Sequence, residues 1–170
     1  MKPNTKPDPS LSANASATTV VLSDQFLKAL EEFETSLESP VMSGELTDWV
    51  TTAQRACEHL GVLVRGDVQR DHAALYASIL REEPELSSQV EKLRETDEQL
   101  SLVGFGNVQL SLKQLLDRAQ SAEQDEAKAT RLRAEVVKQA LAFVISARTQ
   151  ETAISTWFSE SFNRDSGFGD

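Results

Sequence analysis

The 170-residue sequence contains few of the residues that interrupt helices, since it has only seven glycines and five prolines. It also lacks any convincing run of alternating apolar and polar residues, which is the pattern of a half-buried strand. Its single cysteine, Cys57, cannot form an internal disulfide. Because Cys57 falls on an apolar helical face, we expect a small core residue rather than a reactive thiol. These absences favour an all-helical protein.

Long apolar runs are missing as well, and basic residues are outnumbered. No stretch approaches the roughly eighteen apolar residues of a membrane span. The net charge is -10, from 27 acidic and 17 basic residues. Such a charge repels nucleic-acid phosphate and anionic lipid, so we expect neither nucleic acid nor a membrane as a partner. A cation or a basic protein would be favoured instead.

Both ends of the sequence have the composition of tails. Residues 1–19 carry three prolines among serine, alanine, threonine and asparagine, which predicts a disordered N-terminal tail over residues 1–21. This segment has no apolar stretch of the kind found in secretory signals, so we expect a cytoplasmic protein. The glycine-containing end predicts a flexible tail over residues 164–170. Residues 22–163 are then the helical domain.

Four segments carry apolar residues at the spacing of an amphipathic helix. These segments are Ser23–Glu38, Ser43–Ile79, Pro84–Ala119 and Ser121–Phe158. A kink or short break is expected in the second near Gly61 and Gly66, and an interruption in the third at Gly104–Asn107. Because each segment has one apolar stripe and short connections separate them, we predict an all-α, up-down-up-down four-helix bundle.

Polar residues stand on or near the inner faces of three of these helices. His72 lies on the apolar stripe of the second helix, and Asp97 occupies the middle of the stripe of the third. Glu151 falls at one edge of the last helix's stripe and Gln150 at the other. On a straight helix His59 lies about 220° from His72, so we expect His59 to face solvent.

A buried carboxylate at Asp97 would cost several kcal/mol without compensation. A cation, an arginine such as Arg148, protonation or water would have to offset that cost. For His72 a core-edge histidine that is hydrogen-bonded to a neighbour is favoured over a metal ligand or an acid–base group.

Three short segments resemble motifs of the hemerythrin-like (HHE cation-binding) family. Residues 93–100, LRETDEQL, have the spacing of that family's Leu-x-x-Glu-His-x-x-Leu. Residues 147–154, ARTQETAI, are similar to its His-Arg-x-x-Glu-x-x-Leu, and residues 160–165, ESFNRD, resemble the Glu-Ala-Tyr-x-x-Asp ending of some bacterial members. The resemblance covers roughly residues 23–170. It implies a four-helix bundle with a carboxylate-bridged di-iron centre that senses oxygen, iron or redox state.

The metal ligands that the resemblance implies are mostly replaced. Thr96 and Asp97 stand where the family has glutamate and histidine, and Ala147 stands where it has a histidine. Glu151 alone keeps its residue type at a ligand-like place. Two histidines cannot rebuild a histidine-rich di-iron centre. Asp97 is then either a polar relic of a ligand position, or a residue on a slightly rotated helix that reaches solvent.

We therefore expect a non-enzymatic, hemerythrin-like bundle with a degenerate metal site, no cofactor and no catalytic residue. Its role would be interaction or regulation, and the partner that its acidic surface allows is an unspecified protein. The alternative is a cation-binding protein with a reduced, mononuclear iron or manganese site for redox or oxygen sensing. His72, Asp97 and Glu151 would be the metal ligands in that case. A metal-free enzyme ranks last, because no nucleophile–base pair is evident.

Overall fold

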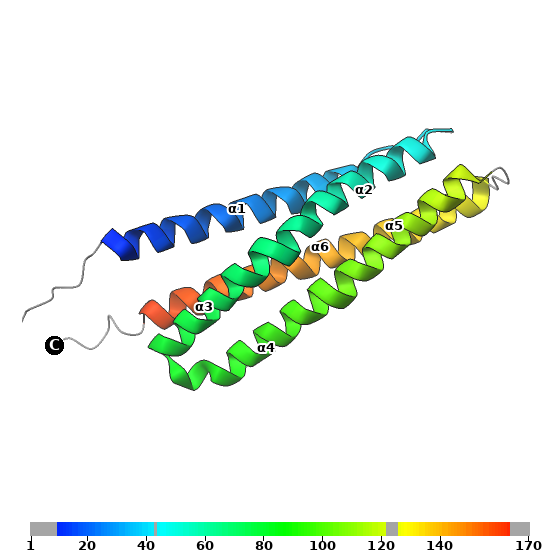
Figure 1. The fold of residues 1–170 in the computed structure, drawn as a ribbon. Coiled ribbons are helices and arrows are strands. Elements are labelled where there is room, and N and C mark those ends of the chain that lie inside the picture. The colour runs from blue at the N-terminus through cyan, green and yellow to red at the C-terminus, as the bar shows by residue number, and fades with distance from the viewer. Residues whose placement is uncertain (1–9, 43, 122–125, 164–170) are drawn as a thin grey trace, which may run out of the picture.

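The computed structural model describes residues 10–42, 44–121 and 126–163, and these residues form four helical arms (Figure 1). The arms are assembled from the following elements: α1 (Ser10–Glu38) for the first; α2 (Leu46–Leu63), η1 (Val64–Val68) and α3 (Gln69–Glu82) for the second; η2 (Pro84–Leu86), α4 (Ser87–Glu98), η3 (Gln99–Gly104) and α5 (Phe105–Gln120) for the third; and α6 (Glu126–Asn163) for the fourth. The prediction of an all-α bundle is confirmed.

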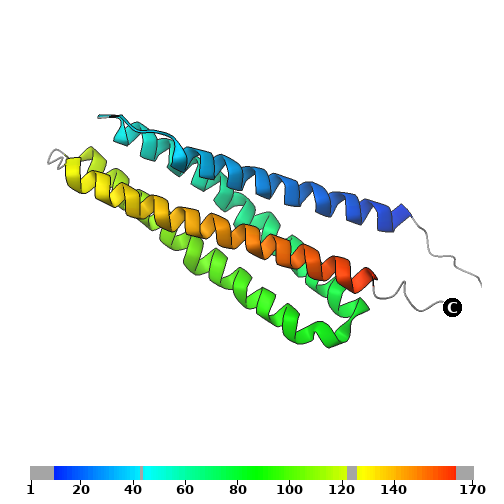
Figure 2. The same ribbon diagram turned by 180° about the vertical axis from the view of Figure 1, so that it is seen from behind.

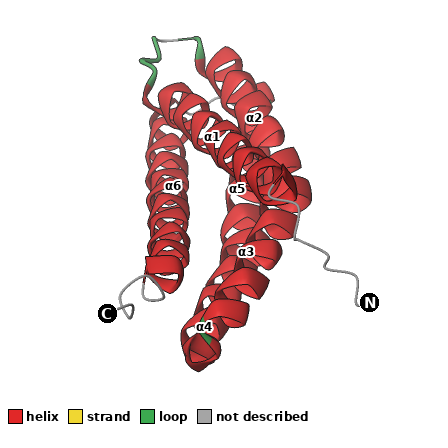
Figure 3. Ribbon diagram, turned by 90° about the vertical axis from the view of Figure 1, so that its left-hand side faces the viewer, coloured by secondary structure: helices red, strands yellow, loops and turns green. Residues whose placement is uncertain are grey.

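Consecutive arms run in opposite directions along the bundle, as the two opposite views in Figures 1 and 2 show. In one half of the bundle α1 lies between α2 and α6, and α5 contacts α2 and α6 on the other side (Figure 3). In the other half, α3 and α4 contact each other and both contact α6. The second and third arms therefore pass through both halves alongside α6.

The larger apolar core fills the half of the bundle built by α1, α2, α5 and α6. The stripe that the sequence predicted for the first helix is buried, with Phe26 4%, Leu30 0%, Phe33 0% and Leu37 1% exposed. These side chains share a cluster with residues from α2, η1, α5 and α6. Burying each leucine or phenylalanine contributes about 1.5–3 kcal/mol, which explains why the four amphipathic arms associate.

A second, smaller apolar cluster occupies the other half of the bundle. Its buried members come from α3, η2, α4 and α6, and they are Tyr76, Ile79, Leu86, Val90, Leu93 and Ile154. Among the described residues, α6 is the only helix with buried members in both clusters. The two clusters are separate, and His72, Asp97, Gln150 and Glu151 lie between them.

The start of the first helix differs from the sequence prediction. The first helix begins at Ser10 rather than at Ser23, so it overlaps the predicted tail of residues 1–21. After Pro9 no proline occurs before Pro40, and nothing in that stretch prevents a helical backbone. Residues 1–9, and the tail predicted for residues 164–170, lie outside the described residues. The last helix is described as far as Asn163, which is also the last residue that the structure describes.

The predicted interruption at Gly104–Asn107 is wrong, because the third arm continues through it as a helix. Glycine weakens a helix by about 1 kcal/mol, which the burial of Phe105 and Val108 at 1% exposure more than offsets. Instead of breaking, the second and third arms each contain one π-helical segment, η1 and η3. Such segments insert a residue into a helix and often mark functional sites.

No helix in the described part of the chain combines the length and the apolar character needed to cross a membrane.

Gly61 packs where a larger residue would clash. A Cβ atom added at Gly61 would lie 2.7 Å from Cζ of Phe105, whose ring is buried against Phe143 with centroids 5.6 Å apart. We expect Gly61→Ala to lower the free energy of unfolding by about 1–3 kcal/mol, although alanine is the better helix former. The matched control is Gly66→Ala, where an added Cβ meets nothing within 4 Å. It should be neutral or stabilise by up to about 1 kcal/mol. Urea unfolding measures both, and equal gains in the two variants would contradict the packing argument.

Candidate functional site

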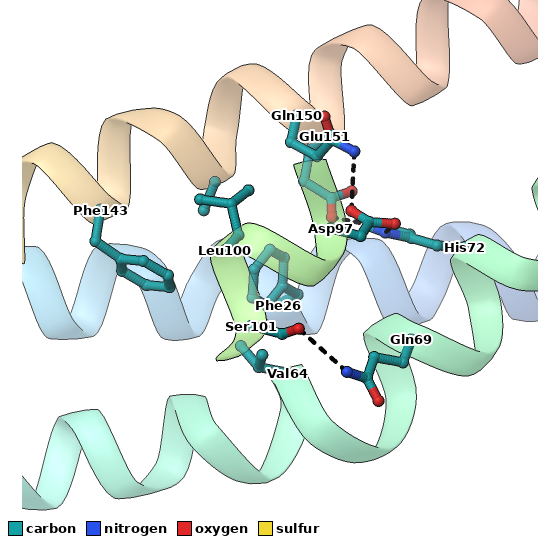
Figure 4. Close-up of a pocket in the computed structure, with 11 residues that line it drawn as sticks. Phe26, Val64, Gln69, His72, Asp97, Leu100, Ser101, Phe143, Gln150 and Glu151 are labelled. Atoms are coloured by element: carbon teal, nitrogen blue, oxygen red, sulfur yellow. Dashed lines mark hydrogen bonds and ion pairs between the residues drawn. The ribbon is translucent and has the colours of Figure 1, made fainter. Parts of the chain in front are cut away.

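The candidate site is built around His72, near the start of α3. His72 is 5% exposed and is placed between the two apolar clusters. Its Nδ1 lies 3.0 Å from Oδ2 of Asp97 on α4, and its Nε2 lies 2.7 Å from Oε1 of Glu151 on α6. Figure 4 shows the three side chains pointing toward one another from three different helices.

Hydrogen bonding fixes the protonation state of the ring. A carboxylate oxygen only accepts, so an imidazole that bonds carboxylates through both nitrogens must donate from both and carry a positive charge. Burial by itself lowers the pKa of His72. The hydrogen bonds to Asp97 and Glu151, together with the charges of the two carboxylates, more than offset burial and raise the pKa to about 9. His72 is therefore an imidazolium at neutral pH.

Two further side chains complete the hydrogen bonds of Asp97. The Tyr76 hydroxyl donates to Oδ2 of Asp97 at 2.5 Å, and Nε2 of Gln150 donates to Oδ1 at 2.9 Å. The same Gln150 nitrogen lies 2.8 Å from the backbone oxygen of Leu93. Burial and the hydrogen bond to Asp97 raise the pKa of Tyr76, so it stays a neutral hydroxyl. Asp97 is thus anchored by groups from α3 and α6.

The cluster carries one more negative than positive charge. Asp97 and Glu151 are each partly shielded, with 19% and 13% of their side chains exposed, against 7% for His72. Removing such charges from water costs several kcal/mol for each ion, and only mutual attraction with good geometry offsets it. The cluster therefore specifies how α3, α4 and α6 are arranged.

A small cavity adjoins the cluster on the side of the larger core. It measures about 30 Å³, which is enough for one water molecule, and apolar side chains such as Leu100 and Phe143 line it opposite His72. At its edge Nε2 of Gln69 donates to Oγ of Ser101 at 3.3 Å and joins the second arm to the third (Figure 4). The cavity is too small for an organic ligand, since ligand pockets usually measure about 300–1,000 Å³.

The arrangement does not suit a metal ion as it stands. The two nitrogens of an imidazole point in different directions, so Asp97 and Glu151 lie on different sides of the ring. A metal must lie within about 2.0–2.2 Å of every ligand atom, and in the described ranges no group of three His, Cys, Asp or Glu residues is arranged around one such point. The other histidine, His59, is surface-exposed beside Glu32 at 3.4 Å. These residues do not fit a histidine-rich di-iron centre, and metal binding by His72, Asp97 and Glu151 stays a prediction.

Comparisons of the chain with protein-family models, with curated proteins and with solved structures give no match. The resemblance to hemerythrin-like proteins accordingly rests on the three sequence segments alone.

The sequence identified most of this site. The structure brings together His72, Asp97, Gln150 and Glu151, which the apolar stripes placed on the inner faces or at their edges. Sequence reasoning missed Tyr76, although its position four residues after His72 puts it on the same face of the helix. Arg148, considered as a partner for Asp97, instead contacts Glu34 on α1 at 2.6 Å. The cost of burying the Asp97 carboxylate is offset by hydrogen bonds from His72, Tyr76 and Gln150.

The raised pKa of His72 predicts a specific dependence of stability on pH. The folded state binds the proton more tightly than the unfolded chain does, whose histidine has the ordinary pKa of 6.5. The contribution is therefore fully present below about pH 6.5 and is lost as the pH rises through about 9. It amounts to roughly 3 kcal/mol. Urea unfolding from about pH 6 to about pH 10 should show this loss in the wild type and in His59→Gln, but not in His72→Gln. A wild-type curve parallel to that of His72→Gln would contradict it.

The proton on His72 also depends on Asp97. Asp97→Asn removes a charge and a charged acceptor from Nδ1, so the pKa of His72 should fall by at least about one unit. Ring ¹⁵N NMR of His72 during a pH titration measures this directly. The neighbouring Glu98 is exposed and serves as the matched control, since Glu98→Gln should leave the titration unchanged. The same titration in both variants would show that Asp97 does not hold the proton.

Proposed function

We propose that the protein is a cytoplasmic, non-enzymatic helical bundle with an interaction or regulatory role, whose centre is held by a buried imidazolium. One observation carries the proposal: both ring nitrogens of His72 are engaged by carboxylates from two other helices. A histidine held in this way has no free nitrogen with which to act as a base or to coordinate a metal. Its role is to join α3, α4 and α6.

Two further groups that could act as nucleophiles, the Tyr76 hydroxyl and the Cys57 thiol, also support a non-catalytic role. The Tyr76 hydroxyl is committed to Asp97, and its pKa is raised. Burial raises the pKa of the Cys57 thiol to about 12, so it stays protonated and unreactive. Cys57 is also 2% exposed and packs in the larger core, away from the cluster.

The hemerythrin-like resemblance gives the cluster an origin, within this proposal. Asp97 and Glu151 occupy ligand-like places in the two resembling segments, and both lie in the buried polar layer of a four-armed helical bundle. In such an ancestor a metal would neutralise carboxylates of this kind. Here the positive charge comes from the proton on His72. The proposal is therefore a hemerythrin-like bundle in which a protonated histidine stands in place of the metal.

A mononuclear cation-binding role is the second candidate. The convergence of His72, Asp97 and Glu151 beside a small cavity favours it, because imidazole and carboxylate are ligands that iron and manganese accept. A cation there would have to displace the proton of His72 and turn the ring toward both carboxylates. Such binding would become stronger as the pH rises.

Metal titration distinguishes the two roles. Protein stripped with a chelator is incubated with Fe²⁺ without oxygen, Mn²⁺ or Zn²⁺ at neutral pH, then desalted for elemental analysis and melted. Under the main proposal less than stoichiometric metal remains and the melting temperature does not rise. A site occupied at about 100 times its Kd would add about 2.7 kcal/mol, which a melt detects easily. One retained equivalent that is lost in Asp97→Asn, but kept in the Glu98→Gln control, would establish the second role instead.

A further inference from the structure

The geometry points to an interaction surface on the outer face of α4 and η3, which binds a basic amphipathic helix of a protein partner. This inference rests on the proposed interaction role and names the chemistry of the partner. The surface is a shallow hollow of about 500 Å³, referred to below as the α4–η3 hollow. The residues that line it are Glu95, Thr96, Glu98, Gln99, Leu102 and Val103.

Two large apolar side chains are exposed side by side in the α4–η3 hollow. Leu102 is 64% exposed and its neighbour Val103 is 51% exposed. Single exposed apolar residues occur on most proteins and need no explanation. Elsewhere in the described ranges the strongly exposed apolar residues are separated along the chain; they are Leu27, Met42, Val62, Leu110, Ile145 and Phe162. The adjacent pair at η3 is therefore the stronger candidate for a contact.

The rim of the hollow is acidic. Glu95 and Glu98 line it together with neutral polar residues, and no lysine or arginine does so among the described residues. Neither glutamate has a basic partner in the part of the chain that the structure describes. The nearby Arg94 lies over the Tyr76 ring instead, at 5.8 Å from its centroid. Unpaired carboxylates around an apolar pair select a cationic partner with an apolar anchor.

The spacing of the lining residues fits a helix as the partner. Glu98 and Leu102 follow Glu95 by three and seven residues on the same arm. The three side chains therefore share one face of that arm, about 10 Å long. An amphipathic helix offers lysine or arginine about one turn from a leucine, which matches that face. A second copy of the chain docked through the same face, as in a two-fold dimer, would place Glu95 and Glu98 against carboxylates, in addition to its charge of -10. Charge therefore favours a basic partner over self-association.

The test uses a labelled model peptide of about 18 residues, an amphipathic helix of leucine and lysine, with a leucine–glutamate peptide of the same pattern as control. Fluorescence anisotropy at near-physiological salt measures binding to the full chain. The leucine–lysine peptide should bind, and the leucine–glutamate peptide should not. Leu102→Ser and the double variant Glu95→Gln/Glu98→Gln should each weaken binding at least about tenfold. Amide NMR shifts caused by the peptide should concentrate on residues 95–103.

Matched controls separate the hollow from general attraction to an acidic protein. Leu110→Ser changes another leucine that is 54% exposed, and Glu135→Gln changes another exposed glutamate. Both should bind the peptide as the wild type does. Equal losses in test and control variants, or no loss in Leu102→Ser, would overturn the inference. Self-association seen by sedimentation and abolished by Leu102→Ser would also overturn it, in favour of a second copy.

The result can be read separately from the proposed function. A chain that retains one equivalent of metal but binds the peptide at the hollow would refute the proton-held centre and leave the surface intact. A metal-free chain that does not bind the peptide would refute the inferred interaction surface and leave the proton-held centre intact.

Discussion

The bond between His72 and two carboxylates is the constraint on which the centre of this bundle depends. The imidazolium lies within hydrogen-bond distance of Asp97 and of Glu151, so one proton-bearing ring joins three helices. Apolar packing tolerates sliding and rotation of helices, because it has little directionality. A charged ring with two donors in one plane does not tolerate it. The polar layer therefore sets the relative rotation and register of α3, α4 and α6 where the two apolar clusters meet.

This layer contributes less to the free energy of folding than to the choice of one helix arrangement over others. The cost of removing three charges from water is large, and well-packed apolar residues would often be at least as stable. The cluster discriminates against other helix arrangements, because a helix that rotates would leave a buried carboxylate without its hydrogen-bond donors. Tyr76 and Gln150 strengthen that discrimination by occupying both oxygens of Asp97. Loss of either carboxylate therefore lowers the free energy of unfolding by more than its own hydrogen bond contributes.

The sequence was sufficient for the architecture because helical stripes are periodic. Phe26, Leu30 and Phe33 could be assigned to a buried face from their spacing alone, and all three are buried. Glycine was a poorer guide: Gly104 and Gly106 suggested an interruption, yet the arm continues through them as η3 and α5. Local propensity near 1 kcal/mol cannot end a helix whose neighbouring residues bury whole phenylalanine and valine side chains. The π-helical segments η1 and η3 contain Gly66 and Gly104, so glycine marked where the helices are irregular but not the form of the irregularity.

The residues of the site could also be identified from the sequence, but the contacts among them could not. Periodicity placed His72 and Asp97 on inner faces and Glu151 at the edge of one, and the structure brings the three together. It could not show that the histidine lies between the carboxylates, because that depends on the rotation of three arms about their axes. Tyr76 was missed because a tyrosine on an apolar stripe resembles an ordinary core residue until its hydroxyl is located. A pattern gives the face of a side chain, and only three-dimensional geometry gives its partner.

The place of α6 has a consequence for how the chain folds during synthesis. Both apolar clusters and the polar layer draw residues from α6, which is the last described helix to leave the ribosome. Neither cluster can close, and His72 cannot meet its second carboxylate, until that helix has been made. The earlier arms cannot complete either cluster on their own, so the described bundle closes only when its last arm is present.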